Sequence, residues 1–275
     1  MYKLEKVEID KTFNLTKTLE CGQSFHFEKI DSKKYIVYGF NSICIIEDKD
    51  LFLELLTDNL PYWISYFALD INYSKIIQYL RGFAKLNSDS FMLRSIEVGE
   101  GIRILRQPYF ETCCSYILSQ QNRIPRIQKM VFELSRKYSS RVVRVNGVDY
   151  SLFPSNKDLQ GVLIDEYKSM GLGYRSEYLF NFVQNWENIF DKIKFKYEED
   201  KELLKSCKGI GEKVANCICL YGLEELDSFP IDTWMKKIIQ KEYVEKGKEL
   251  KLPDKYAGIL QQFMFYYVRN EGGLQ

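Results

Sequence analysis

The sequence predicts an α+β protein in which an antiparallel β-domain over about residues 1–90 precedes a mostly α-helical domain over residues 91–275. Short runs of alternating apolar residues are concentrated in the first 90 positions, whereas helical spacing of apolar residues dominates from about Phe91 onward. A chain of 275 residues with 45% hydrophobic content is long enough for one large domain or for two to three small ones.

The N-terminal part is predicted to contain strands joined by tight turns. Residues 35–38 and 42–46 are β-like, and the intervening Gly39-Phe40-Asn41 is typical of a hairpin. Helical spacing predicts helices over residues 62–69 and 73–83. The only histidine, His26, lies in a strand-like segment, so we expect it on a strand surface rather than acting as a general base.

The second part is predicted to be a succession of amphipathic helices. A polar loop over residues 120–126 connects the first two of them, and Pro125 suits the first turn of the second. The basic segment 136–144 is adequately explained by a charged surface turn. Apolar spacing predicts helices over residues 109–119, 127–138, 158–163, 177–186, 197–205 and 255–267.

Composition excludes several classes of protein. No apolar run is long enough to cross a bilayer, and the N-terminal segment lacks the apolar core of a signal peptide. Seven cysteines at irregular spacings form no zinc pattern and indicate reduced thiols, so we expect a cytoplasmic protein, in a bacterium, with no metal and no cofactor. The net charge of +1 is uninformative, because nucleic-acid binding depends on local basic patches.

The most informative stretch runs from Leu203 to Trp234 and is predicted to form a helix, a tight turn and a second helix, followed by a loop. The turn contains Gly209 and Gly211, which permit backbone conformations closed to other residues and leave N–H groups uncovered at the start of the second helix. Such a helix start can bind a phosphate. An ordinary helix–helix turn explains the same glycines, while Ile210 between them is expected to anchor the turn to the core.

Two side chains in this stretch supply an amine and a carboxylate, the groups that a lysine-based nucleophilic mechanism needs. Lys213 lies in the first turn of the second helix, where the helix dipole and partial burial both favour the uncharged amine that a nucleophile requires. Most lysines are simply solvated, which is the alternative. Asp232 follows Phe229-Pro230-Ile231 and is a favoured N-cap for a helix that begins at Thr233. The cap and a catalytic role are compatible, because a cap holds the carboxylate in place.

Together these residues resemble the helix–hairpin–helix DNA glycosylases, and among them the 8-oxoguanine DNA glycosylase/AP lyases. The resemblance rests on Gly209-x-Gly211-x-Lys213-Val-Ala, on Cys217-Ile-Cys219-Leu and on Pro230-Ile-Asp232. It implies a β-domain followed by a helix–hairpin–helix core, over about residues 200–224. It also implies excision of 8-oxoguanine from duplex DNA by a Schiff-base mechanism with strand cleavage, in which Lys213 attacks the sugar and Asp232 assists.

The resemblance extends from Gly22 to Phe265 and implies further site residues. The damaged base is expected to meet the carbonyl of Gly22, the ring of Phe265, and the side chains of Gln261 and Cys217; Gln261 and Phe265 share one helix face. By the same resemblance, Gln121 fills the gap left by the base, Tyr174 wedges into the stack, and the remaining DNA contacts come from Asn122, Arg126, Arg175, Gly209 and Gly211. Two positions depart from the family pattern: Gln121 replaces Asn, and Trp234 replaces a histidine that contacts phosphate.

Two other functions remain open. A helix–hairpin–helix module can hold DNA without catalysis, but that function needs neither Lys213 nor Asp232. The second is a related glycosylase that acts on other damaged bases. Monofunctional glycosylases lack the lysine, so Lys213 argues against them. Other relatives carry an iron–sulfur loop, and this sequence has no cysteine after Cys219 that could form one. We therefore expect a monomer that binds 8-oxoguanine-containing double-stranded DNA, without an iron–sulfur cluster and without a membrane.

Overall fold

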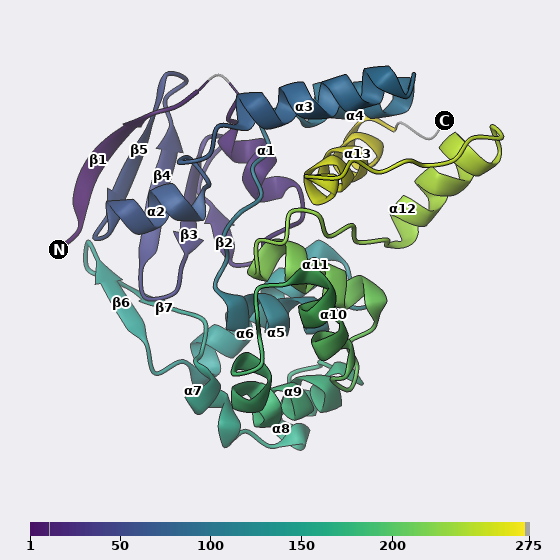
Figure 1. Cartoon of the computed structure of the whole chain (residues 1–275). Coiled ribbons are helices and arrows are strands. Elements are labelled where there is room, and N and C mark those ends of the chain that lie inside the picture. Colours follow the sequence, from purple (N-terminus) through teal and green to yellow (C-terminus); the bar gives the residue numbers. More distant parts are fainter. Residues whose placement is uncertain (11, 273–275) are drawn as a thin grey trace.

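A five-stranded antiparallel sheet forms the N-terminal part of this computed structural model, which describes residues 1–10 and 12–272 (Figure 1). The strand order is β1-β5-β4-β3-β2. The turn predicted at residues 39–41 is confirmed, because the N–H of Gly39 donates to the carbonyl of Ser42 at 2.8 Å and β3 pairs with β4. The strands are β1 (Lys3–Glu8), β2 (Phe27–Lys29), β3 (Lys34–Tyr38), β4 (Ile43–Asp48) and β5 (Phe52–Thr57).

One face of the sheet is buried and carries the apolar side chains, because successive residues of a strand point to opposite faces. Tyr35 and Val37 of β3 point into a cluster with Leu15 and Leu19 of α1 (Leu15–Glu20). Side chains of the α2 helix (Leu60–Tyr66), among them Trp63, complete this cluster. Both helices begin at an asparagine whose side chain accepts an N–H of the first turn, as expected for N-caps.

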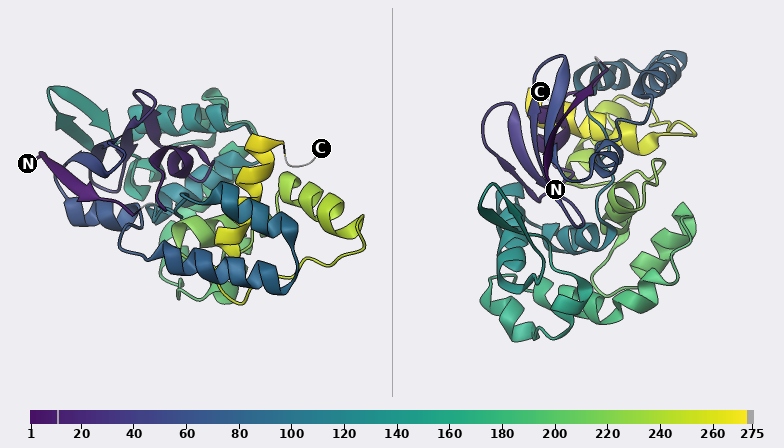
Figure 2. Two further views of the ribbon diagram at one scale, coloured as in Figure 1. Left: turned by 90° about the horizontal axis from the view of Figure 1, so that it is seen from above. Right: turned by 90° about the vertical axis from the view of Figure 1, so that its left-hand side faces the viewer.

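The remaining helices build a second and larger core. The α11 helix packs against α5 and α10, α13 packs against α4 and α12, and α4 packs against α3. Figure 2 shows the sheet and the helices α7–α10 as distinct parts of the molecule. The helices are α3 (Tyr73–Leu86), α4 (Ser90–Gly99), α5 (Tyr109–Ser119), α6 (Ile124–Tyr138), α7 (Asn156–Gln160), α8 (Ile164–Ser169), α9 (Arg175–Phe190), α10 (Tyr197–Lys205), α11 (Glu212–Gly222), α12 (Thr233–Ile238) and α13 (Ala257–Glu271), with a π-helix, η1, at Ile239–Val244.

The predicted surface turn at residues 136–144 is wrong. The α6 helix extends to Tyr138, and the chain then forms a second, two-stranded sheet from β6 (Val142–Val145) and β7 (Val148–Ser151). Asn146 and Gly147 between these strands both have positive φ, +50° and +82°, and Asn-Gly in this conformation is a strong hairpin signal in the sequence. Tertiary packing stabilises the hairpin, since Val145 lies in a cluster with Tyr38 and Ile43 of the main sheet.

The surface position predicted for His26 is also wrong, because its side chain is only 2% exposed. Its Nδ1 lies 2.8 Å from a carboxylate oxygen of Glu111 on α5, and its ring stacks on Tyr38 with centroids 4.1 Å apart. Nε2 faces the hydroxyl of Ser135 on α6 at 3.4 Å. A polar side chain beside a strand can be buried when other elements supply its hydrogen-bond partners. The sequence around such a residue does not indicate these partners, because they lie far away in the chain.

The division into domains at about residue 90 stays a prediction. The sheet ends at Thr57, and residue 90 is the first residue of α4, which packs with α3 on α13. None of the described helices has the length and apolar character that a membrane crossing would require.

Candidate active site

The turn between α10 and α11 has the predicted helix–hairpin–helix form. Gly209 has a φ of +88°, and a Cβ there would lie 2.2 Å from the ring of Tyr178, so both conformation and space require glycine. Ile210 is buried, as predicted. Gly211 is different: its backbone is extended at φ −90°, which any residue can adopt, and a Cβ there would meet no neighbouring atom within 4 Å, so its predicted conformational role is wrong. It leaves the start of α11 sterically open.

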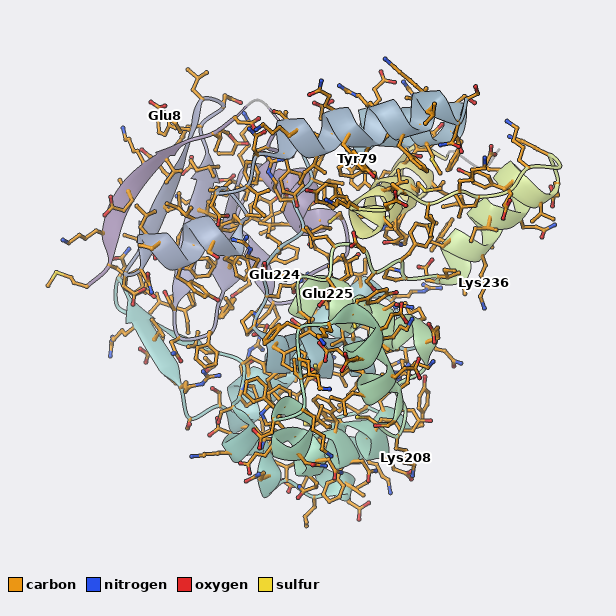
Figure 3. The ribbon with its side chains drawn as sticks, viewed as in Figure 1. Glu8, Tyr79, Lys208, Glu224, Glu225 and Lys236 are labelled. Atoms are coloured by element: carbon orange, nitrogen blue, oxygen red, sulfur yellow. The ribbon has the colours of Figure 1, made fainter. Side chains whose placement is uncertain are left out.

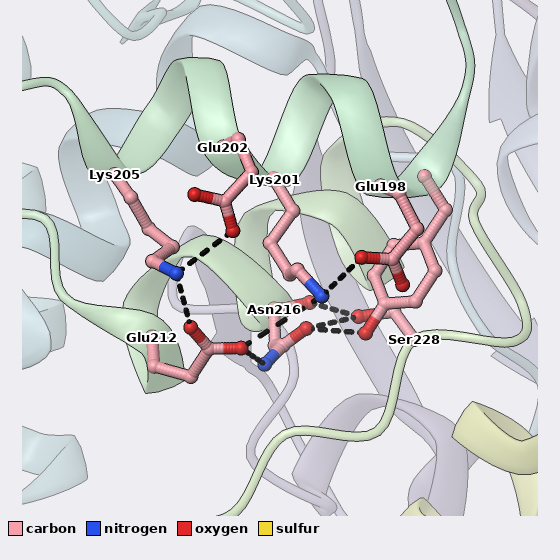
Figure 4. A network of polar contacts seen from close by, with 8 residues as sticks. Glu198, Lys201, Glu202, Lys205, Glu212, Asn216 and Ser228 are labelled. Atoms are coloured by element: carbon pink, nitrogen blue, oxygen red, sulfur yellow. Dashed lines mark hydrogen bonds and ion pairs between the residues drawn. The ribbon is translucent and has the colours of Figure 1, made fainter.

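Ion pairs join α10 to the first turn of α11 (Figure 4). Glu212 accepts a charge-assisted bond from Lys205 at 2.8 Å and lies 3.9 Å from Lys201. The hydrogen bond from Lys205 is the main cause that lowers the pKa of Glu212 below its ordinary value. The acidic side chain also suits the positive end of the helix dipole. These contacts orient the helix that carries Lys213.

Lys213 is half-buried on the first turn of α11. Its Nζ lies over the ring of Tyr116, 5.4 Å from the centroid. One turn further along α11 is Cys217, which is 4% exposed. Burial raises the pKa of the Cys217 thiol, the charge of Lys213 and a hydrogen bond from it act in the opposite direction, and the charge of Asp232 adds to the rise. Lys213 and Cys217, which are four residues apart, lie on the same face of α11.

Asp232 is held by its own backbone and by the loop before it. Its Oδ1 accepts the N–H of Met235 at 2.8 Å, which confirms the predicted N-cap of α12. The loop from α11 is tied back to that helix by Ser228, whose hydroxyl donates to the carbonyl of Asn216 at 2.9 Å. Tyr197 of α10 donates to the Asn216 side chain at 2.6 Å (Figure 4). The carboxylate is thus fixed relative to α11.

Gly22 lies at a bend with a φ of +92° between α1 and β2. A Cβ here would lie 3.0 Å from the guanidinium of Arg269, 3.1 Å from Ile124 and 3.7 Å from the ring of Phe265. The bend is therefore seated against α13 and the start of α6. This brings Gly22 and Phe265 together, as predicted, although 243 positions separate them in the sequence.

Gln261 of α13 carries an unusual polar atom. The side chain is only 4% exposed, and its Oε1 is buried without a hydrogen-bond partner within the described chain. Leaving a buried acceptor unpaired costs about 1–3 kcal/mol. Phe265, one turn along the same helix, is half-buried. An unpaired acceptor beside an accessible ring is the arrangement expected of a site that awaits a ligand.

The loop between α5 and α6 places Gln121 on the surface. Its φ is +47°, a conformation that few non-glycine residues adopt, and the side chain is exposed. Asn122 bonds inward, to the carbonyl of Leu118 at 3.3 Å. Arg126 is exposed and donates to the carbonyl of Gly171 at 3.1 Å, which joins this loop to the next one.

Tyr174 and Arg175, which are both expected to contact DNA, differ in accessibility. Tyr174 is 44% exposed, whereas Arg175 is 6% exposed. The Arg175 guanidinium donates to the carbonyls of Gln120, Gln121 and Leu172, with Nε 2.8 Å from the Gln120 oxygen. Arg175 therefore holds the α5–α6 loop in this structure, and contact with a base would require these bonds to be exchanged.

The exposed residues of the hairpin and of α12 lie along one edge of the molecule. Figure 3 shows Lys208 of the turn and Lys236 of α12 on this edge, with Glu8 of β1 on the opposite side. Trp234, which departs from the family pattern, is 39% exposed and lies beneath the Lys237 ammonium at 5.2 Å. Among the described residues, no cluster of His, Cys, Asp and Glu could hold a metal ion.

Comparison with known proteins agrees with this geometry. Residues 6–113 match the family model described as "8-oxoguanine DNA glycosylase, N-terminal domain". The chain is 28% identical to the N-glycosylase/DNA lyase of Saccharomyces cerevisiae over 286 residues, which cover 88% of this chain and 72% of that protein. The sequence is thus similar to the 8-oxoguanine DNA glycosylases, through the family model in its N-terminal part and through the yeast relative over most of its length.

Solved structures of this family share the whole fold. The 8-oxoguanine glycosylase/lyase of Clostridium acetobutylicum, in complex with double-stranded DNA containing cytosine opposite 8-oxoguanine, superposes with a TM-score of 0.84. It is 28% identical, and the match covers 99% of this chain and 98% of the other. The protein named MBOgg1, in complex with a low-affinity DNA ligand, is 27% identical and superposes with a TM-score of 0.86 over 99% of both chains. The fold class predicted from the sequence is confirmed.

The sequence alone did not indicate three buried residues at the site. Tyr116, Tyr221 and Gln262 lie between Gly22 and Lys213 and are bonded to one another or to their surroundings. Each reads as an ordinary core position on an amphipathic helix. Their hydroxyl and amide groups on the inner faces of α5, α11 and α13 could have indicated a buried hydrogen-bond network, because buried polar groups require partners.

Proposed function

We propose that this chain is a bifunctional DNA glycosylase that excises 8-oxoguanine from duplex DNA and then cleaves the strand at the abasic site. The observation that carries the proposal is the placement of Lys213 and Asp232 on one framework: Lys213 lies half-buried at the start of α11, and Ser228 ties the loop that leads to Asp232 back to the same helix. A protein that only held DNA would need neither a half-buried amine nor a carboxylate fixed relative to the helix that carries that amine.

The nucleotide must leave the helix before reaction, because a stacked base hides its sugar C1′. Tyr174 and Gln121 are exposed on neighbouring loops and are suited to occupy the opened stack. The start of α11 is open at Gly211 and supplies main-chain N–H groups for a phosphate, while Gly209 forms the turn before it. Arg126 adds positive charge on the same side, and Asn122 supports the loop from within.

The extruded base is proposed to enter between the Gly22 bend and α13. Phe265 offers a ring for stacking, and the unpaired Oε1 of Gln261 offers an acceptor for an N–H on the base edge. Cys217, one turn from Lys213 on α11, is proposed to line the same space. A base seated there would satisfy a buried acceptor that has no partner among the described residues.

The chemistry proceeds by attack of an uncharged amine. Lys213 Nζ forms a bond to C1′ while the C1′–N9 bond breaks and the electron pair leaves with the base, which takes up a proton. Asp232 stabilises the positive charge that develops on the sugar. Ring opening yields a Schiff base with Lys213, and β-elimination of the 3′ phosphate cleaves the strand.

We infer that the protein acts as a monomer in the bacterial cytoplasm, without an iron–sulfur cluster. All seven cysteines are free thiols and six are buried, in keeping with a reducing compartment. The sequence has no cysteine beyond Cys219 that could complete a four-cysteine motif.

The test is covalent trapping with borohydride. Wild-type protein should be trapped on a duplex with 8-oxoguanine, because reduction fixes the Schiff base, and Lys213→Gln should bind this duplex without being trapped or excising the base. Lys168→Gln, an exposed lysine on α8, is the matched control and should be trapped like wild type. Trapping of Lys213→Gln would contradict the assignment.

A panel of duplexes separates the alternatives. Binding without excision of any base would indicate a DNA-holding module, and preferred excision of another lesion would indicate a sister glycosylase. Placing each of the four bases opposite 8-oxoguanine would in addition measure the opposite-base preference.

A further inference from the structure

Two stacked tyrosines connect the helix that carries Lys213 with the rest of the pocket. Tyr116 of α5 and Tyr221 of α11 are both buried, and their rings are 5.5 Å apart and 9° from parallel. Phe25 packs edge-on against Tyr116 with centroids 5.6 Å apart. The rings are therefore fixed on several sides.

Hydrogen bonds connect the two tyrosine hydroxyls to the carbonyls of the two residues that flank Gly22, one directly and one through a glutamine side chain. Tyr116 donates directly to the carbonyl of Gln23 at 3.1 Å. Tyr221 donates to Oε1 of Gln262 at 2.5 Å, and Nε2 of Gln262 donates to the carbonyl of Cys21 at 3.3 Å. Tyr116 and Tyr221 thus support the chain at the residue after Gly22 and at the residue before it, and Gln107 also donates to the carbonyl of Gln23, at 2.9 Å.

The same pair contacts the reacting end of the site. The Nζ of Lys213 lies over the Tyr116 ring. Lys213, Cys217 and Tyr221 follow at intervals of four residues along α11, so they lie on the same face of that helix. One rigid aromatic unit therefore touches the amine on one side and supports the glycine bend on the other.

We propose that Tyr116 and Tyr221 are positioning residues that hold the Gly22 bend at a set distance from Lys213, so that a base seated at the bend presents its sugar to the amine. This inference rests on the proposed function, because it assigns Gly22 to the base and Lys213 to the sugar.

The chain itself does not fix the distance between Gly22 and Lys213, so side-chain contacts must do so. Gly22 lies outside the sheet ladders, with a left-handed φ, and is separated from Lys213 by 191 positions in the sequence. Hydrogen bonds in a buried, low-dielectric site hold such a bend more firmly than contacts with water would. A displacement of about 1 Å between reacting groups can cost roughly a hundredfold in rate.

The experiment compares two substrates that share the lysine chemistry but differ in the base. Excision of 8-oxoguanine requires both the Gly22 bend and Lys213, whereas cleavage of a duplex with a preformed abasic site requires Lys213 but no base. Tyr116→Phe and Tyr221→Phe each keep the ring and remove one hydroxyl. In each variant, single-turnover excision should fall by roughly ten- to a hundredfold, with abasic-site cleavage unchanged.

Tyr167→Phe is the matched control. Its hydroxyl is also in the core, bonded to the carbonyl of Leu159 at 3.5 Å, but on α8 and away from the site. It should leave both rates unchanged. Thermal unfolding of each variant verifies that the native fold is retained, and Gln262→Leu tests the same connection if one tyrosine variant does not fold.

The outcomes separate this inference from the proposed function. Selective loss of excision supports the positioning role. Wild-type rates in both tyrosine variants, or an equal loss on both substrates, would overturn it, because a merely structural role does not discriminate between substrates. If wild-type protein excised no 8-oxoguanine, the proposed function would fail instead.

Discussion

Asp232 combines a structural and a chemical role through its two carboxylate oxygens. Oδ1 caps α12 by accepting the N–H of Met235, which leaves Oδ2 for the sugar. Asparagine is as good an N-cap as aspartate but carries no charge. The two roles can therefore be separated by substitution.

We expect Asp232→Asn to retain stability and lose activity. The free energy of unfolding should change by only a few tenths of a kcal/mol, whereas Asp232→Ala should lower it by about 1 kcal/mol through loss of the cap. Both variants should excise 8-oxoguanine far more slowly, because neither stabilises positive charge on the sugar. Urea unfolding and single-turnover rates are the measurements; a wild-type rate in Asp232→Asn would remove Asp232 from the mechanism.

Gln261 differs from Asp232, because its buried Oε1 accepts no hydrogen bond among the described residues and so adds nothing to the stability of the fold. Gln261→Leu should leave the free energy of unfolding unchanged or raise it by up to about 1 kcal/mol, since an unpaired acceptor is removed. It should also slow excision of 8-oxoguanine in single-turnover assays, because the base edge loses the acceptor for its N–H. A clear loss of stability would show that Oε1 is already satisfied in the free protein.

At the level of elements, the α10–α11 unit depends on charge. The folded pKa of Glu212 lies below its ordinary value, chiefly because Lys205 bonds to the carboxylate. Such a group adds stability above the unfolded pKa of about 4.3, and this stability is lost as the pH falls through the lower, folded value.

Glu212→Gln should therefore lower the melting temperature slightly at neutral pH, by about 1 °C, since the pair is exposed. Near pH 3 the difference should shrink, and high salt should reduce it at neutral pH. Glu187→Gln, at an exposed position of α9, is the control. A difference that is independent of pH would mean that Glu212 acts through packing rather than through charge.

At the level of the whole molecule, His26 joins the sheet to the helices. It lies next to β2, while its partners Glu111 and Ser135 belong to α5 and α6. Hydrogen bonds from buried side chains of one part to the other restrict how the two parts can move. The Gly22 bend depends on this junction, because it lies only four positions before His26.

We expect His26→Phe to destabilise the protein by about 3 kcal/mol, because the buried carboxylate of Glu111 loses its partner. Adding Glu111→Gln should restore part of this loss, since the amide carries no charge. Urea unfolding of the two single variants and of the double variant provides the coupling energy. Additive effects would show that the two side chains do not stabilise one another.

Much of the fold and part of the site were predictable from local sequence. The boundaries of α5 and α10 agree with the prediction, as do the hairpin turn, Ile210 in the core and the cap at Asp232. Each depends on interactions within a few residues, such as apolar spacing or a side chain that accepts a neighbouring N–H. The Asn146-Gly147 hairpin was equally local, and its signal was overlooked.

The sequence by itself determined the elements, the residue types of the chemistry and, through its motifs, the resemblance to the 8-oxoguanine DNA glycosylases. Only the tertiary structure decided which side chains meet: that His26 is buried against Glu111, that Arg175 bonds to backbone carbonyls, and that two tyrosines link the Gly22 bend to Lys213. The physical reason is range. Local conformation follows from sterics and hydrogen bonds over a few residues, whereas burial and partnership follow from packing between segments that may lie 200 positions apart.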